Sequence, residues 1–443
     1  MIDFDPSCKN KYYSLYKKLR GEILRGKFKK GERLPSKRVL SREAGVSVVT
    51  VQLAYEQLEA EGYIRAEQRR GYFVEEVNAP SAPAARTAVK NVQREEVKPF
   101  RCDLVKGNIP ADMFPFSTWA RLMREVLSDC GEHLLERVPC AGDIELREAL
   151  SDYLYRSRGI DADPRYVVVG AGAEYLYGVI VQLLGRDKIF AVENPGYGKI
   201  SSTYALNGAK FIPVAVGARG MSMENLCSCG ADAAHVSPSH QFPTGAVMPV
   251  TARAKLIEWA NGGDRYVIED DYDSEFRLSG RPLQSTCGLC PEKVIYMNTF
   301  SKSLAPSMRL GYMVLPPALY EKYIRIFSAS ANSVPLFEQK ALAKMLNGGY
   351  FERHISRLKN YYRGIRRLLL ERLDGLCAID DTGSGLHVIA RFEGLSDEEI
   401  KKRARDRGVN LKCVTDYLIA PLDGFAGQAV INYSGLTEKV LNE

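Results

Sequence analysis

Three side chains in the middle of the chain have types and spacing that suit chemistry in one shared pocket. Asp270 and Tyr272 end an apolar run at residues 266–268, and residues two apart on a strand point to the same face. Lys302 follows a second apolar run, residues 294–297. A lysine amine that has lost its proton can form a Schiff base, and burial favours the neutral amine. A carboxylate and a phenol beside it could hold a positively charged aromatic ring.

Groups that can bind a phosphate flank this lysine. Thr299 and Ser301 supply hydroxyls, and the guanidinium of Arg309 can bind two phosphate oxygens at once. Earlier in the chain, a glycine turn leads from an apolar run into a helical pattern that begins at Ala173 and Glu174. The backbone N–H groups at the start of such a helix bind anions.

Two further turns complete the pattern. Residues 193–197 read ENPGY and place Tyr197 where it could stack on a ring, and residues 238–245 form the rigid turn PSHQFPTG. The combination predicts a pyridoxal phosphate site, with Asp270 at the pyridine nitrogen and Tyr272 at the ring hydroxyl. Each motif alone has a plainer interpretation, namely an acidic loop, a solvated lysine, a surface ion pair, an ordinary turn or a structural histidine.

The elements that must position these residues form an α/β body from residue 100 onward. Short β-branched runs alternate with helical stretches, which is typical of a largely parallel sheet, and about seven strands are expected within residues 167–315. Past residue 317 the pattern becomes mainly helical, followed by strand-like pieces near 386–390 and 429–433. We therefore expect a large lobe at 100–317 and a smaller α+β lobe at 318–443.

A separate head precedes this body. Residues 76–99 are rich in alanine, proline and charge without apolar periodicity, which predicts a linker after a head at 1–75. In the head, a helix is expected at 12–27, a second from Ser36 to Gly45, and a third from Ser47 to residue 61. A hairpin follows at 64–74. Two helices joined by a short glycine-containing turn predict a helix-turn-helix, and the hairpin predicts a wing.

Charge is concentrated in the same head. The whole chain carries a net charge of +7, and residues 1–75 account for +6 of it. A small basic module on a nearly neutral body indicates a polyanion as the module's partner. A solvated basic face is the alternative.

Composition and cysteines restrict the remaining choices. With 45% hydrophobic and 26% charged residues the chain is typical of a globular protein, and no apolar run approaches the length of a membrane span. Because the first residues lack a secretory signal, we expect a cytoplasmic protein whose ten cysteines are mostly free thiols. Cys287 and Cys290, with Cys227 and Cys229, could alternatively form a metal or redox site, but a further pair at zinc-ribbon spacing is missing.

The head resembles the DNA-binding domain of the GntR family along the string LPSKRVLSREAGVSVVTVQLAYEQLEAEGYI. The resemblance implies that the cap of the second helix, the front of the recognition helix and the wing contact DNA, through Ser36, Arg38, Ser47, Thr50, Gln52, Arg69 and Arg70. The family usually has an arginine where this chain has Val48, which cannot contact a phosphate or guanine and is placed to touch a thymine methyl. A helical protein-interaction module is the alternative.

The body resembles a fold-type I aminotransferase, and the whole chain is similar to the MocR/GabR branch of the GntR regulators. The strings PSHQFPTG, IEDDYDSEF and IYMNTFSKSLAPSMRLGYMVLPP are close to those of that branch. The resemblance implies that Lys302 carries pyridoxal 5'-phosphate as an internal aldimine, and that the remaining contacts come from Asp270, Tyr272, Tyr197, Thr299, Ser301, Arg309, Ala173 and Glu174. Phe242 stands where free-standing aminotransferases usually carry an asparagine.

Two features separate a regulator from an enzyme. Gly435 occupies the position where relatives that respond to an amino acid carry an arginine for the carboxylate, and Lys199 stands where they have a second arginine. The printed sequence ends at Glu443, short of the closing helix expected of such domains. We therefore expect a regulator whose amine or amino-acid-like effector, or the cofactor itself, changes DNA binding. The alternative is a pyridoxal phosphate-dependent aminotransferase that retains a DNA-binding domain.

The resemblance also implies the partners. Members of this branch bind double-stranded DNA as head-to-tail homodimers, in which the head of one chain lies over the body of the other. Such a dimer would match paired half-sites on DNA.

Overall fold

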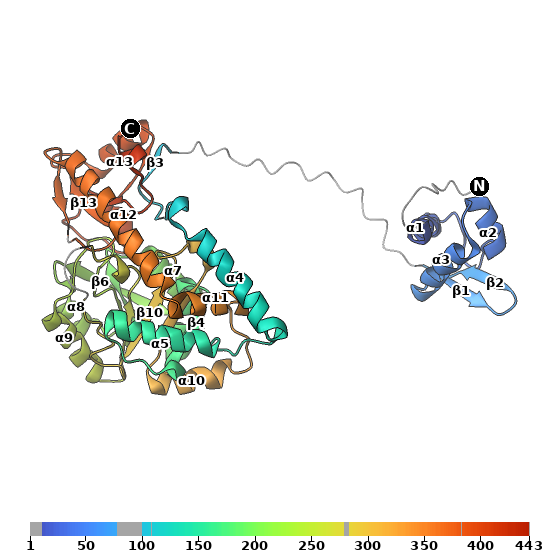
Figure 1. Ribbon diagram of the computed structural model, residues 1–443, viewed down its shortest axis with the longest axis horizontal. Coiled ribbons are helices and arrows are strands. Elements are labelled where there is room, and N and C mark those ends of the chain that lie inside the picture. The colour runs from blue at the N-terminus through green and yellow to red at the C-terminus, as the bar shows by residue number, and fades with distance from the viewer. Residues whose placement is uncertain (1–10, 78–99, 108, 279–282, 382, 443) are drawn as a thin grey trace. The chain divides into compact units, whose positions relative to one another are not determined.

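The computed structural model describes residues 11–77, 100–107, 109–278, 283–381 and 383–442. The chain divides into two compact units, residues 1–97 and 98–443, and Figure 1 shows the helices and strands of each. The linker expected at residues 76–99 lies, apart from its first two residues, outside the described part of the chain.

The head is a three-helix unit with a two-stranded hairpin. Its apolar core joins all three helices to the hairpin, and α1 and α3 contribute Leu15, Leu19, Tyr55 and Leu58. The expected caps are present, because the side chains of Ser36 and Ser47 accept hydrogen bonds from the starts of the second and third helices. The elements are α1 (Lys11–Leu24), α2 (Lys37–Ala44), α3 (Val48–Ala60), β1 (Ile64–Glu67) and β2 (Gly71–Val74).

The body is built on an eight-stranded sheet in the order β4-β11-β10-β9-β8-β5-β6-β7. The pairs among β10, β9, β8, β5 and β6 are parallel, whereas β11 runs antiparallel to both β10 and β4. All seven expected strands are present, and the short β7 extends the edge. Their bounds are β4 (Val167–Gly170), β5 (Ile189–Asn194), β6 (Lys210–Gly217), β7 (Gly220–Met221), β8 (Ala233–Val236), β9 (Tyr266–Asp270), β10 (Val294–Thr299) and β11 (Gly311–Val314).

Helices cover both faces of this sheet, which explains why its strands are continuous apolar runs. Neighbouring strand residues pack into different cores: Val267 belongs to one hydrophobic cluster and Ile268 to the other. One face carries α5 (Ile144–Arg158) and α9 (Val250–Asn261), and the other carries α6 (Ala173–Leu184) and α7 (Gly198–Leu206). The short α8 (Met223–Ser228) packs near α9.

The smaller lobe contains a four-stranded antiparallel sheet and the long helix α12, drawn in orange in Figure 1. A segment from the start of the body joins this lobe, because β3 (Cys102–Asp103) pairs in parallel with β14 (Val409–Asn410). The strands of the four-stranded sheet are β12 (Ala378–Asp380), β13 (His387–Arg391), β16 (Gln428–Asn432) and β15 (Lys412–Cys413). The remaining helices are α4 (Phe116–Cys130), α10 (Pro317–Phe327), α11 (Leu336–Asn347), α12 (Tyr350–Leu373), α13 (Asp397–Asp406) and α14 (Glu438–Asn442).

Within the described ranges, no helix is long and apolar enough to cross a membrane. The nine cysteines of these ranges are free, and none of their His, Cys, Asp and Glu side chains form a group of three or more that could hold a metal ion. Cys287 lies in the core below β10, where burial raises the pKa of its thiol.

Candidate functional site

The candidate site lies at the carboxyl ends of the central strands. Asp270 is the last residue of β9 and is paired in register with Met297 of β10, the strand that leads to Lys302. In open α/β sheets, ligands bind in the crevice outside these strand ends. The parallel pairing of β9 and β10 therefore brings the two predicted motifs to one edge of the sheet.

Asp270 is buried in a network that the sequence did not reveal. The hydroxyl of Tyr177 on α6 donates to its Oδ2 at 2.6 Å, and Nε2 of His235 on β8 lies 3.3 Å from the same oxygen. The hydroxyl of Tyr204 lies 2.6 Å from Nδ1 of His235. If that hydroxyl donates, Nδ1 accepts, and the imidazole proton on Nε2 then faces the carboxylate. Both contacts use Oδ2 of Asp270, which leaves Oδ1 for a further donor.

The surroundings of Lys302 favour an unprotonated amine. Its Nζ donates to the carbonyl of Gly107 at 3.3 Å, and burial lowers the pKa of the amine, although Asp273 partly opposes the shift. A Cβ atom added to Gly107 would lie 1.9 Å from that Nζ. A larger residue at position 107 would therefore have to displace the end of the lysine side chain.

The phenol of Tyr272 lies beside a buried histidine and carboxylate. Its hydroxyl is 3.2 Å from Nδ1 of His240, and the same nitrogen is 2.9 Å from Oδ2 of Asp273. Burial, with the negative charge of Asp273, raises the pKa of the Tyr272 phenol well above its ordinary value. Tyr272 therefore keeps its proton and can donate it in a hydrogen bond.

Arg309, one of the expected phosphate ligands, lies at the start of α6. The guanidinium of Arg309 packs so closely on Gly172 that a Cβ there would lie 3.1 Å from its Cζ. Gly172 also has a φ of +83°, which disfavours any other residue at this position. Thr299 ends β10, and Ser301 follows in the turn before Lys302. The predicted guanidinium and the predicted helix start are thus in contact.

A carboxylate already pairs with the cations at this helix start. Glu174 Oε1 is 2.8 Å from Nζ of Lys199, and its Oε2 is 3.6 Å from Nη2 of Arg309. The contact with Lys199 lowers the pKa of Glu174. Lys199, expected to hold an effector carboxylate, is therefore occupied by the side chain of Glu174.

Aromatic rings close the other end of the site. Tyr197 is 43% exposed and meets Phe242 edge to face, with ring centroids 6.2 Å apart. Phe242 also packs edge to face on Tyr417 at 4.9 Å and on His387 at 5.1 Å. The position that carries an amide in free-standing aminotransferases thus belongs to an aromatic cluster between the two lobes.

Contacts between the lobes fix this cluster. Nδ2 of Asn194 donates to the carbonyl of Ala420, and its Oδ1 accepts from the N–H of Ile419. The N–H of Gly196 donates to the carbonyl of Tyr417 at 3.0 Å. The turn that positions Tyr197 is therefore held by the small lobe.

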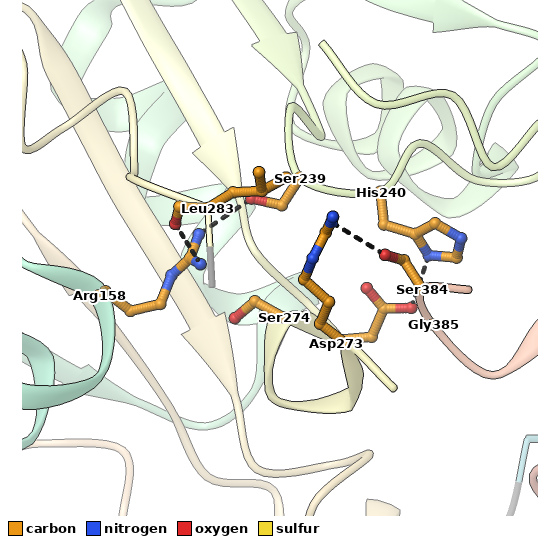
Figure 2. Close-up of a pocket in the computed structure, with 9 residues that line it drawn as sticks. Arg158, Ser239, His240, Asp273, Ser274, Leu283, Ser384 and Gly385 are labelled. Atoms are coloured by element: carbon orange, nitrogen blue, oxygen red, sulfur yellow. Dashed lines mark hydrogen bonds and ion pairs between the residues drawn. The ribbon is translucent and has the colours of Figure 1, made fainter. Parts of the chain in front are cut away.

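His240 also lines a small cavity, and Figure 2 shows the residues around it. Arg158 borders it and is neutralised by Asp271, whose Oδ2 is 2.8 Å from its Nε. The same guanidinium donates to Ser239 Oγ and to the carbonyl of Leu283. Arg158 therefore anchors the loop that carries His240, which is a structural role.

Gly435, at the position where the expected carboxylate-binding arginine is missing, follows β16. Gly435 is exposed there, and it brings no positive charge. Asn432, at the end of β16, lies near the lysine, because a Cβ on Gly107 would be 3.0 Å from its Nδ2 and 1.9 Å from Nζ of Lys302.

In the head, the residues expected to contact DNA lie at the surface, with Thr50 half-buried. Ser47 and Thr50 share a hydrogen bond between their hydroxyls at 2.8 Å, and Gln52 donates to Glu56 at 2.8 Å. Arg69 sits at the tip of the wing with a φ of 63°. The described exposed side chains of this set also include Ser36, Arg38 and Arg70.

The sequence did not predict four residues of the site: Gly107, Tyr177, His235 and Asp273. Tyr177 lies one helical turn after Ala173, so the spacing on α6 could have indicated it. Asp273 belongs to the same acidic string as Asp270. Gly107 and His235 gave no local signal, because their partners are far away in the chain.

Comparison with known proteins decides the family. Residues 11–74 match the model described as bacterial regulatory proteins, gntR family, and residues 106–442 match aminotransferase class I and II. The chain is 34% identical over 407 residues to an uncharacterized HTH-type transcriptional regulator, YdeL, of Bacillus subtilis, covering 90% of this chain and 88% of the relative. It is 32% identical to the probable rhizopine catabolism regulatory protein MocR of Rhizobium meliloti, covering 97% and 91%.

The chain belongs to the MocR/GabR branch of the GntR transcription regulators. Among solved structures, its body is similar in fold to the kynurenine aminotransferase of Pyrococcus horikoshii, with a TM-score of 0.69, 24% identity, and coverage of 78% of this chain and 89% of that one. The regulator thus joins a DNA-binding head to an aminotransferase-like body. Its relatives across the full length are regulators, which supports regulation over free-standing transamination.

Proposed function

We propose that this regulator holds pyridoxal 5'-phosphate on Lys302 and that an amine or amino-acid-like effector, or the cofactor itself, changes its DNA binding. The observation that carries the proposal is the amine of Lys302, whose pKa is lowered by burial and which follows β10, while the buried Asp270 ends the neighbouring strand β9. When bound, the cofactor supplies an aldehyde carbon that reacts with amines. We assign the DNA-binding head to residues 1–75, the linker to 76–99 and the effector-binding body to 100–443.

The donor set suits each part of that cofactor. Oδ1 of Asp270, which Tyr177 and His235 do not contact, would hold a pyridine nitrogen, and the phenol of Tyr272 would donate a hydrogen bond to the ring oxygen. Arg309 and the N–H groups at the start of α6 suit the phosphate. Tyr197 offers an exposed ring face for stacking. Thr299 and Ser301 complete the proposed contacts.

The proposed effector is an amine held without the usual arginine. Gly435 supplies no cation, and Phe242 belongs to an apolar aromatic cluster. Lys199 is the remaining candidate for an effector carboxylate, and it must first exchange Glu174 for that carboxylate. We further propose a head-to-tail homodimer that places two heads on paired DNA half-sites.

The absorption spectrum of the loaded protein tests the assignment of Lys302. Replacement by alanine removes the amine that the cofactor needs, so Lys302→Ala is expected to lose the protein-bound absorption band seen in the wild type. Lys359→Ala, which removes a different partly buried lysine on α12, serves as the control and should keep the band. An unchanged spectrum in Lys302→Ala would refute the proposal.

The second candidate function is transamination, favoured by the lowered pKa of the Lys302 amine and by the aminotransferase fold. A single-turnover experiment separates the two. Loaded protein is mixed with a panel of amino acids, and absorbance follows conversion to the pyridoxamine form and its reversal by a keto acid. We expect spectral changes on amine binding without a complete cycle, and a complete cycle would establish the enzyme.

A further inference from the structure

The front of the recognition helix α3 is apolar. Val48, Val49 and Leu53 are 42%, 65% and 45% exposed. The core side of the same helix is formed by Val51 and Tyr55, which are both fully buried. Successive residues of a helix are rotated by about 100°, so Val49 lies opposite the core. Val49 therefore points away from the core, and Val48, the first residue of α3, is exposed at the N-terminal end of the helix.

The polar side chains of the same turns are already engaged. The Thr50 hydroxyl bonds to that of Ser47, and the amide of Gln52 donates to the carboxylate of Glu56. The carboxylate of Glu56 would repel the phosphates of DNA rather than bind them. In the first turn of α3, the exposed side chains without hydrogen-bonding groups of their own are therefore Val48 and Val49.

The major groove of DNA presents one apolar group that such a surface can contact. Every base pair presents hydrogen-bond donors or acceptors there, and thymine alone adds a C5 methyl group. We propose that Val48 and Val49 select the operator by packing against thymine methyl groups in the major groove. The valines would then carry base selection.

Arginines supply the contacts to DNA that do not depend on its sequence. Arg38 on α2 and Arg69 at the wing tip are exposed. Contacts of arginine with phosphates position a protein on DNA without reading its sequence. Affinity therefore comes largely from the arginines, and discrimination among sequences from the two valines.

Deoxyuridine provides the test, because it pairs like thymidine but lacks the C5 methyl. Full-length protein is used to enrich binding sites from random duplexes, and the enriched site is synthesised with deoxyuridine at one thymine at a time. We expect a roughly three- to fivefold loss of affinity at one or two thymines in each half-site, the size expected for one buried methyl group. Replacement at the remaining thymines should have little effect.

The double variant Val48→Ala/Val49→Ala connects this loss to the two side chains. It should bind thymine and deoxyuridine sites equally, and it should remain folded because alanine favours an exposed helix more than valine does. Val250→Ala, a change of the same kind at a 69% exposed position on α9 of the body, should keep the wild-type preference. Equal binding of both sites by the wild type, enrichment of half-sites without thymine, or an undiminished preference in the double variant would each overturn the proposal.

Discussion

Lys302 depends on a glycine that is 195 positions away in the chain. Because a Cβ at residue 107 would overlap its Nζ, we predict that Gly107→Ala displaces the amine and lowers the fraction of protein that carries the cofactor at least severalfold. The cofactor-to-protein ratio, measured by absorbance after dialysis, checks this. The variant should unfold at nearly the wild-type temperature, since the lysine end is flexible and can move aside.

Gly364→Ala is the matched control for that change. Gly364 lies within α12, and a Cβ there would meet no atom within 4 Å. Alanine stabilises a helix interior by about 1 kcal/mol relative to glycine, so this variant should be at least as stable as the wild type and fully loaded. Equal loading of both glycine variants would contradict the role given to residue 107.

Glu174 places a negative charge where a phosphate is proposed to bind. Its carboxylate pairs with Lys199 and lies 3.6 Å from Arg309. We predict that Glu174→Gln tightens cofactor binding by about threefold to tenfold, because a partly exposed like-charge contact costs roughly 1 kcal/mol. Fluorescence titration of the cofactor-free protein measures the dissociation constant.

Glu398→Gln separates this effect from a general effect of helix charge. Glu398 also lies in the first turn of a helix, α13, in the small lobe. Its replacement should leave the dissociation constant unchanged. Weaker binding in Glu174→Gln would instead mean that the carboxylate helps to position Lys199 or Arg309.

At the scale of elements, a buried carboxyl joins β5 to the turn that carries Phe242. Burial raises the pKa of Glu193 to about 8, and the amide of Gln241 lies 3.4 Å from its Oε2. The folded protein therefore holds a proton that an unfolded glutamate releases near pH 4.5. The stability due to this proton is fully present below pH 4.5 and is lost as the pH rises through about 8.

Glu193→Gln should remove this pH dependence because glutamine does not titrate. We predict that the free energy of unfolding of the variant, relative to the wild type, rises with pH between 4.5 and 8, by at most about 1.4 kcal/mol per pH unit. Urea unfolding of the cofactor-free proteins over this range provides the measurement. A constant difference at every pH would show that the pKa of this carboxyl is the same in the folded and unfolded protein.

Sequence patterns predicted most of these elements but not all of their pairings. Apolar runs located all seven principal strands, and Ser36, Ser47 and Gly45 marked the helix ends of the head, because these signals lie within a few residues of the elements they define. The parallel pair between β3 and β14 was not foreseen, since it joins segments about 300 residues apart. Periodicity reports which face of an element is buried, and it does not report which distant segment covers that face.

The sequence likewise predicted some residues of the candidate site and missed others. Asp270, Tyr272 and Lys302 were predicted because each stands at a fixed offset from an apolar strand. His235 and Tyr177, which orient Asp270, come from a different strand and a helix. Only the folded sheet brings these side chains together.

At the scale of the whole molecule, the head and the body have separate hydrophobic cores. We therefore predict that a fragment of residues 98–443 keeps the absorption band of the cofactor on Lys302 and loses DNA binding. A fragment of residues 1–77 should fold cooperatively, as measured by circular dichroism. It should bind a single operator site only weakly, near the micromolar or weaker range of nonspecific contacts, because the proposed dimer contacts two half-sites at once.

The full chain should differ from its fragments in how its operator affinity responds to an effector. An effector that enters the body should change the operator affinity of the intact protein and leave that of the head fragment untouched, because the fragment has no effector site. Fluorescence anisotropy with labelled operator, with and without the amine that shifts the cofactor spectrum, measures both. An effector that changed the affinity of the isolated head would show that regulation does not pass through the body, and would place the effector on the DNA-binding unit itself.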